Sequence, residues 1–302
     1  MLSALCTDWK QPIDPGEVDS TQIDLFVVKV SSASPNPKPD PLLIINGGPG
    51  GSSVDLLIDL DGANILKGIL NKRDVIVMDQ RGTGRSSPLA CPALADNQPH
   101  LNHTNVKLLA KKCLGQLNYD PRYFSTAYAV QDIENLRIVL GKDQLNVYGV
   151  SYGSRVAMEY ARQFEESTRT ITLDGVVPPS IALGPNVAIK SQEALNLVFK
   201  QCGESIACNS AFPNLEEKFW DLMTRLEKHP VNTKFRDPRS GDPIEVKVEK
   251  EHLALVIRMS LYNPELRSLL PFLIYETSLE NDFSRIAANS IQLLDQLGQS
   301  IS

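Results

Sequence analysis

A serine stands between a buried strand and a helix in this sequence, and that placement constrains the chain more than any other feature. The apolar run Leu145–Val150 predicts a strand, and Tyr152–Phe164 has a helical pattern. Between them lies the G-x-S-x-G segment Gly149–Gly153, with Ser151 at its centre. A sharp strand-to-helix turn forces a serine hydroxyl out of the sheet, and the flanking glycines prevent clashes in the turn. Ser151 is therefore a candidate nucleophile; the alternative is a tight turn with an idle serine.

A nucleophile of this kind needs hydrogen-bond donors for the negative charge that develops on the substrate oxygen. The amide of Tyr152 points toward that space from a helix N-terminus, where negative charge is stabilised. The loop Gly47–Gly51 follows the buried run Leu42–Ile45, and glycines let a backbone approach a ligand closely. We expect Gly48 to supply the second amide, with Gly47 as the next choice; an ordinary glycine-rich connection is the alternative.

The glycine-rich segments do not fit a nucleotide site. A G-x-G-x-x-G pattern would fall on Gly48–Ser53 or Gly82–Ser87, and both lack the last glycine. The lysine of a phosphate-binding P-loop is also missing. No metal is expected, because the five cysteines form no C-x-x-C pair and the chain has four histidines. The sequence therefore predicts no cofactor.

Buried runs and helical patterns alternate in the first part of the chain, which predicts an α/β fold with a mostly parallel sheet and helices on both faces. Further strands are expected at Asp74–Met78 and Arg169–Val176, and helices at Leu56–Leu70 and Thr126–Leu140. Residues 88–125 are expected to be irregular. Residues 1–180 would form the core.

The character of the chain changes after Pro178-Pro179. Residues 181–302 show mainly helical patterns, with one β-like interruption near Ile244–Val248. We expect them to form a helical cap or second domain.

Composition excludes several partners. The 302 residues carry 36 acidic and 30 basic side chains, a net charge of -6, so the basic footprint of a nucleic-acid binder is missing. No window approaches 18 apolar residues, and no membrane span is expected. Residues 1–12 lack the pattern of a signal peptide.

Four of the five cysteines lie at spacings that suit short-loop disulfides. Cys91 and Cys113 flank a polar segment, and Cys202 and Cys208 are six residues apart. Two disulfides at these positions would imply an oxidising compartment. The alternative is five ordinary buried thiols, and Cys6 has no obvious mate in either case.

Three ordered motifs resemble the α/β-hydrolase peptidases of the proline iminopeptidase and tripeptidyl aminopeptidase type. Gly47–Gly50 is similar to their G-G-P-G oxyanion loop, Asp79–Ser86 to their D-x-R-G-x-G-x-S segment, and Gly149–Ser154 to their G-x-S-Y-G elbow. The resemblance covers roughly residues 5–180 and, more weakly, the helical part. It implies an α/β-hydrolase fold with a helical cap, and release of N-terminal proline or short peptides through an acyl-enzyme on Ser151.

The resemblance also implies roles for other residues. Asp79 and Arg81 would brace the oxyanion loop. The acidic residues Glu193 and Glu204 of the cap would bind the free amine of the substrate; the alternative for each is a solvated surface carboxylate. Many members of the branch with two disulfides are exported, so a periplasmic or secreted protein is expected, and otherwise a cytoplasmic one.

The remaining catalytic residues are harder to place. In this fold the chain order is serine, then acid, then histidine, and only His229 and His252 follow Ser151. Both lie in the expected cap, and neither follows a buried strand. Asp174, at the end of the strand after the elbow helix, is a possible acid. Our hypothesis is that the chain is the N-terminal portion of a longer hydrolase, with the last strands, the acid and the histidine outside it. The alternatives are a carboxylesterase or lipase of the same fold, and a non-catalytic binding member.

Overall fold

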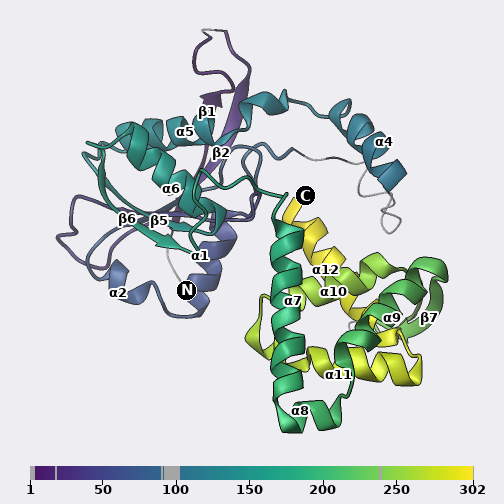
Figure 1. The fold of residues 1–302 in the computed structure, drawn as a ribbon. Helices are drawn as coiled ribbons and strands as arrows, with labels where there is room; N and C mark the ends of the chain where they lie inside the picture. Colours follow the sequence, from purple (N-terminus) through teal and green to yellow (C-terminus); the bar gives the residue numbers. More distant parts are fainter. Residues whose placement is uncertain (1–3, 18, 90, 92–102, 238–239, 302) are drawn as a thin grey trace. The chain divides into compact units, whose positions relative to one another are not determined.

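The chain folds into two compact units, which are described separately. The computed structural model describes residues 4–17, 19–89, 91, 103–237 and 240–301 (Figure 1). The first unit extends through Ile181 and takes in the end of the last helix from Gly298, and the second comprises Ala182–Leu297.

A six-stranded sheet forms the centre of the first unit, in the order β1-β2-β4-β3-β5-β6. β3 pairs in parallel with β4 and with β5, and β5 pairs in parallel with β6, whereas β2 is antiparallel to β1 and β4. The predicted α/β class with a mostly parallel sheet is confirmed. The strands are Ala4–Pro12 (β1), Gln22–Val30 (β2), Leu42–Ile45 (β3), Val75–Met78 (β4), Leu145–Val150 (β5) and Thr168–Asp174 (β6).

Helices cover both faces of this sheet because successive side chains of a strand point to opposite sides. Leu43 and Ile45 of β3 pack in one cluster with Tyr160 of α6 and with residues of α5. Ile44, between them, packs in a second cluster with Leu57 of α1. The helices of this unit are Ser53–Gly62 (α1), Lys67–Leu70 (α2), His103–Leu114 (α4), Thr126–Val139 (α5) and Tyr152–Gln163 (α6), with a 3-10 turn at Pro121–Tyr123 (η1).

Two predictions about this unit were wrong. The helix expected at Leu56–Leu70 is two helices, because Asn64 takes a left-handed conformation with φ 58° that a continuous helix cannot contain. Residues 88–125 are not irregular throughout, since they include α4 and η1. The sequence of α4 is rich in lysine and leucine, which are good helix formers.

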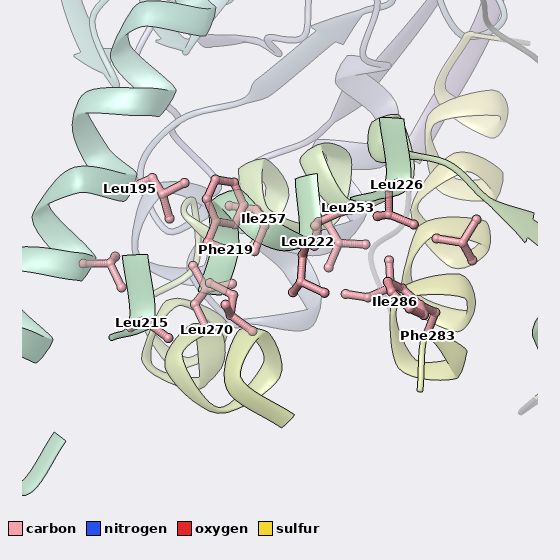
Figure 2. Close-up of a cluster of buried hydrophobic side chains, with 14 of the residues drawn as sticks. Leu195, Leu215, Phe219, Leu222, Leu226, Leu253, Ile257, Leu270, Phe283 and Ile286 are labelled. Atoms are coloured by element: carbon pink, nitrogen blue, oxygen red, sulfur yellow. The ribbon is translucent and has the colours of Figure 1, made fainter. Parts of the chain in front are cut away.

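The second unit is mainly helical and has its own core. Leu195, Phe219, Leu222, Leu253 and Ile286 are among its buried side chains (Figure 2). The interruption expected near Ile244–Val248 is β8, and it pairs antiparallel with a strand that the sequence analysis missed, β7. The elements are Val187–Glu204 (α7), Ile206–Ala211 (α8), Leu215–Lys228 (α9), Val231–Arg236 (β7), Pro243–Val248 (β8), Lys250–Ser260 (α10), Pro264–Glu280 (α11) and Ser284–Ile301 (α12).

Disulfides join the two cysteine pairs that the sequence predicted. The Cα atoms of Cys91 and Cys113 lie 5.3 Å apart, and those of Cys202 and Cys208 lie 5.0 Å apart. The second disulfide ties α8 to the end of α7. Cys6 is an exposed free thiol in β1.

The described ranges contain no helix with the length and apolar character of a membrane span. They also contain no group of three or more His, Cys, Asp or Glu side chains arranged to hold a metal ion.

Leu253 should be a sensitive point of the second unit, because it is fully buried in the core of Figure 2. We expect Leu253→Ala to lower the free energy of unfolding of this unit by about 2–5 kcal/mol through lost burial and a cavity. Urea unfolding followed by the fluorescence of Trp220, in a Trp9→Phe background, would measure this unit alone. Leu197→Ala is the control, since Leu197 is 55% exposed on α7; equal losses in both variants would contradict the assignment of this core.

Candidate active site

Ser151 occupies a strained turn between β5 and α6. Its backbone has φ 53° and ψ -118°, a combination that a residue with a side chain rarely adopts. The amide of Ser151 donates to the carbonyl of Asp174 at 2.7 Å, and the hydroxyl of Ser154 donates to the carbonyl of Ser151 at 2.5 Å. The end of β6 and the first turn of α6 therefore hold the turn in place, and the Ser151 side chain is left exposed.

The glycines on either side of Ser151 are required by direct backbone contacts. A Cβ on Gly149 would lie 2.3 Å from the carbonyl oxygen of Gly153, and a Cβ on Gly153 would lie 2.2 Å from the carbonyl oxygen of Ile45. Both distances are far too short for any side chain. The β5–α6 turn thus packs with its backbone against the end of β3, where the glycine-rich loop begins.

The loop that follows β3 passes directly beside the serine. A Cβ on Gly47 would lie 2.6 Å from Ser151 Cβ and 3.1 Å from Ser151 Oγ. The Gly47 amide donates to Asn46 Oδ1 at 2.7 Å, so it is already occupied. Gly48 has a φ of 115°, and neither its amide nor that of Tyr152 has a hydrogen-bond acceptor in the described part of the chain. Of the two glycines considered from the sequence, Gly48 is the one with an available amide.

Asp79 connects the two loops that lie beside the elbow. Its carboxylate is buried and accepts hydrogen bonds from Ser52 Oγ at 2.9 Å and from the Val54 amide at 3.2 Å, both just beyond the glycine-rich loop. The other carboxylate oxygen accepts from the Arg85 amide at 3.0 Å. These contacts agree with the bracing role that the resemblance implied for Asp79.

Arg81 makes different contacts from those expected. Its guanidinium forms two hydrogen bonds of 2.7 Å with the carboxylate of Asp132 on α5. It also donates to the carbonyls of Ile13 at 2.8 Å and Tyr123 at 2.9 Å. None of these bonds reaches the Gly47–Gly51 loop, so Arg81 anchors α5 and the ends of β1 and η1 rather than bracing that loop directly.

Asp174 has a partner that bears on its possible role as the catalytic acid. Tyr148 donates its hydroxyl proton to Asp174 Oδ2 at 2.7 Å. Burial and this hydrogen bond raise the pKa of Tyr148 to about 12, so the phenol stays protonated at neutral pH. One oxygen of the Asp174 carboxylate is thus engaged by Tyr148.

The structure does not bring a histidine to Ser151 within the first unit's described side chains. His100 lies outside the described residues, and His103 begins α4. His229 follows α9 and His252 lies in α10, both in the second unit. The Nδ1 atom of His252 accepts from the Glu249 amide at 3.1 Å, which makes it part of a helix cap.

The two glutamates proposed for amine binding lie on α7 of the second unit. Glu193 is paired with Lys190 at 2.7 Å, and Glu204 with Lys200 at 3.9 Å. Both pairs are exposed, and exposed pairs contribute little to stability.

A cavity of about 230 Å³ opens beside the elbow. Pro49, Gly50, Gln80, Phe124 and Tyr152 are among the residues that line it. Gln80 is a residue that the sequence analysis passed over, although it stands between Asp79 and Arg81 in a motif that was recognised. A larger cavity, of about 570 Å³, lies near the Cys202–Cys208 disulfide of the second unit and contains none of the catalytic candidates.

A strained serine between a strand and a helix, on a mostly parallel sheet with a glycine-rich loop beside it, defines an α/β hydrolase. Residues 40–197, about half of the chain, match the alpha/beta hydrolase fold family, and the chain belongs to this family.

Several curated relatives carry peptidase names. The chain is 25% identical over 284 residues to a serine protease, Hip1, of Mycobacterium tuberculosis, covering 87% of this chain and 54% of that protein. It is 31% identical over 141 residues to a proline iminopeptidase of Xylella fastidiosa (47% and 34% covered). It is 26% identical over 185 residues to a tripeptidyl aminopeptidase of Streptomyces lividans (56% and 34% covered). The predicted resemblance is confirmed for the family, and the chain spans about half or less of the length of these relatives.

The close approach at Gly47 predicts a loss of stability on adding one methyl group. We expect Gly47→Ala to lower the free energy of unfolding of the first unit by about 1–3 kcal/mol, because the loop or the elbow must move. Gly68→Ala is the matched control: Gly68 lies in α2 with open space around it, and the same change there should be neutral or stabilising by up to about 1 kcal/mol. Scanning calorimetry would compare the two, and a Gly47→Ala protein as stable as the wild type would contradict the geometry.

The Tyr148–Asp174 hydrogen bond predicts an unusual titration. We expect the ultraviolet difference between wild type and Tyr148→Phe to show a phenol that ionises near pH 12. Asp174→Asn should move this ionisation toward the ordinary tyrosine pKa of about 10, because the nearby carboxylate no longer disfavours the phenolate. A Tyr148 that ionises near pH 10 in the wild type would show that Asp174 does not hold this hydrogen bond.

Proposed function

We propose that this chain carries the nucleophile and the oxyanion hole of a serine aminopeptidase that releases N-terminal proline or short peptides. Ser151 attacks the scissile carbonyl and forms an acyl-enzyme, while the amides of Gly48 and Tyr152 donate to the oxyanion. The observation that carries this proposal is the strained Ser151, whose hydroxyl lies beside the Gly47 backbone and an unoccupied Gly48 amide.

The peptide substrate is inferred from the names of the curated relatives. An aminopeptidase must recognise a free ammonium group, and we propose Glu193 and Glu204 for this role. Their present partners are lysines on the same helix. Because such exposed pairs are weak, a substrate ammonium could replace a lysine without a large loss of stability.

We further propose that the catalytic histidine and its acid come from outside these 302 residues. Two observations support this: the matched part of the Hip1 protease is only 54% of that protein, and the described histidines after Ser151 lie in helical surroundings of the second unit. Asp174 remains a candidate acid. The two disulfides support a site of action in an oxidising compartment, periplasmic or extracellular.

The proposal predicts that the 302-residue polypeptide alone hydrolyses peptide arylamides very poorly. Without the base, the rate should fall roughly 10⁴-fold or more below that of a protein extended to the length of its relatives. Steady-state assays of both forms would measure this. Robust turnover by the isolated 302 residues that Ser151→Ala abolishes would show instead that the base lies within this chain.

The extended protein also allows the rival functions to be separated. A fluorophosphonate should label Ser151, and the label should be lost in Ser151→Ala but kept in Ser268→Ala, a serine of α11. Proline, alanine and tripeptide arylamides would then be compared with nitrophenyl esters. A preference for the esters would favour a carboxylesterase or lipase, and the absence of labelling would favour a non-catalytic binding member of the fold.

A further inference from the structure

Gln80 is a buried residue whose side-chain amide has nothing to bond. It is only 7% exposed. Its backbone carbonyl accepts from the amide and from the hydroxyl of Thr83, each at 2.9 Å. The side-chain amide, by contrast, has no hydrogen-bond partner among the residues that the structure describes. The amide atoms of Gln80 are not among the fully buried unpaired atoms of the described residues, so they keep some accessible surface; because Gln80 lines the cavity beside the elbow, its amide is available to a ligand there.

The position of the cavity connects it with the proposed oxyanion hole. Pro49 and Gly50 directly follow Gly48, and Tyr152 supplies both a wall of the cavity and the other proposed oxyanion amide. A substrate whose carbonyl oxygen lies between those amides would therefore place an adjacent residue in the cavity. Its volume, about 230 Å³, is below the range of roughly 300–1,000 Å³ that is typical of drug-sized ligands, and suits a single substrate residue.

Most of the other polar side chains that line the cavity already form hydrogen bonds or ion pairs within the protein. Thr126 Oγ1 and the hydroxyl of Tyr152 lie 2.5 Å apart and share a hydrogen bond. The guanidinium of Arg81 is neutralised by Asp132. Within the described lining, Ser125 is a further polar side chain without a partner, but it is exposed. The ligand that this cavity recognises is thus a neutral group that can hydrogen-bond a carboxamide.

We propose that Gln80 hydrogen-bonds a peptide group of the substrate residue in this cavity and thereby favours peptides over esters. The inference rests on the proposed function. A carboxamide has an acceptor in Oε1 and a donor in Nε2, and the N–H of a peptide group can donate to Oε1. An ester has the carbonyl but no N–H, so it leaves Oε1 unpaired, which costs binding free energy.

A cycle of protein and ligand changes tests this proposal. The protein is the 302-residue chain with Ser151→Ala, which cannot form an acyl-enzyme on that serine. The probes are trialanine amide and its analogues in which each internal amide N–H is replaced in turn by an ester oxygen. Calorimetry should show that one ester analogue binds roughly three- to tenfold more weakly than the peptide. In Gln80→Met, which keeps the length of the side chain, that ratio should fall to about one.

Gln131→Met is the matched control. Gln131 lies in α5 of the first unit, but its amide donates to Gln163 at 3.1 Å and it does not line the cavity. This variant should keep the wild-type ratio, and thermal unfolding of both variants would verify that they fold.

Three results overturn the proposal: no binding of trialanine amide, a ratio of one in the starting protein, or an unchanged ratio in Gln80→Met. Since the readout is binding without Ser151, these results are independent of the labelling experiment. An unlabelled Ser151 would refute the proposed catalysis while leaving the binding cycle intact, and an unchanged ratio with a labelled Ser151 would refute the role of Gln80 alone.

Discussion

The strained backbone of Ser151 is the constraint on which the rest of the site depends. A positive φ at a residue with a side chain costs free energy, so the surroundings must hold it in place. They do so by backbone contact: α6 lies against β3 where Gly153 meets Ile45, and the loop after β3 lies against Ser151 at Gly47. The two amides proposed for the oxyanion belong to the same segments. The conformation that exposes the hydroxyl therefore also positions the donors around it.

Backbone contacts of this kind need support from the layer beneath them. Asp79 accepts hydrogen bonds from both neighbouring loops, and the Arg81–Asp132 pair ties α5 to the ends of β1 and η1. Burial raises the pKa of Asp132, while the two hydrogen bonds from Arg81 oppose that shift. A buried pair is weak evidence for stability, but removal of one partner would leave an uncompensated charge, a loss of about 3–5 kcal/mol. These buried charged residues fix the positions of helices and loops, whereas the groups proposed to contact the substrate are neutral.

The sequence predicted what depends on short-range patterns. Ser151, its glycines and the loop at Gly48 follow from local backbone rules, and the sheet follows from apolar runs that alternate with helices. The break at Asn64 was missed because a left-handed residue inside a helical pattern leaves no periodic signal. Gln80 was missed for a different reason. Its burial, and the absence of a hydrogen bond from its carboxamide to the described residues, arise only when loops distant in sequence come together. The roles assigned to Arg81 from the motif failed in detail because a motif does not specify where a long side chain points.

The neutral donors and acceptors proposed for this site would give it a particular kind of selectivity. The donors proposed for the oxyanion are backbone amides, and the cavity beside them is lined by Gln80, whose carboxamide forms no hydrogen bond with the described residues. A site that hydrogen-bonds its substrate rejects an analogue that lacks the matching group, because a buried polar atom is then left unpaired. Charged partners would instead attract any ligand of opposite sign. A peptide and an ester differ here by one N–H. On our proposal, Gln80 distinguishes them because its carboxamide accepts a hydrogen bond from that N–H.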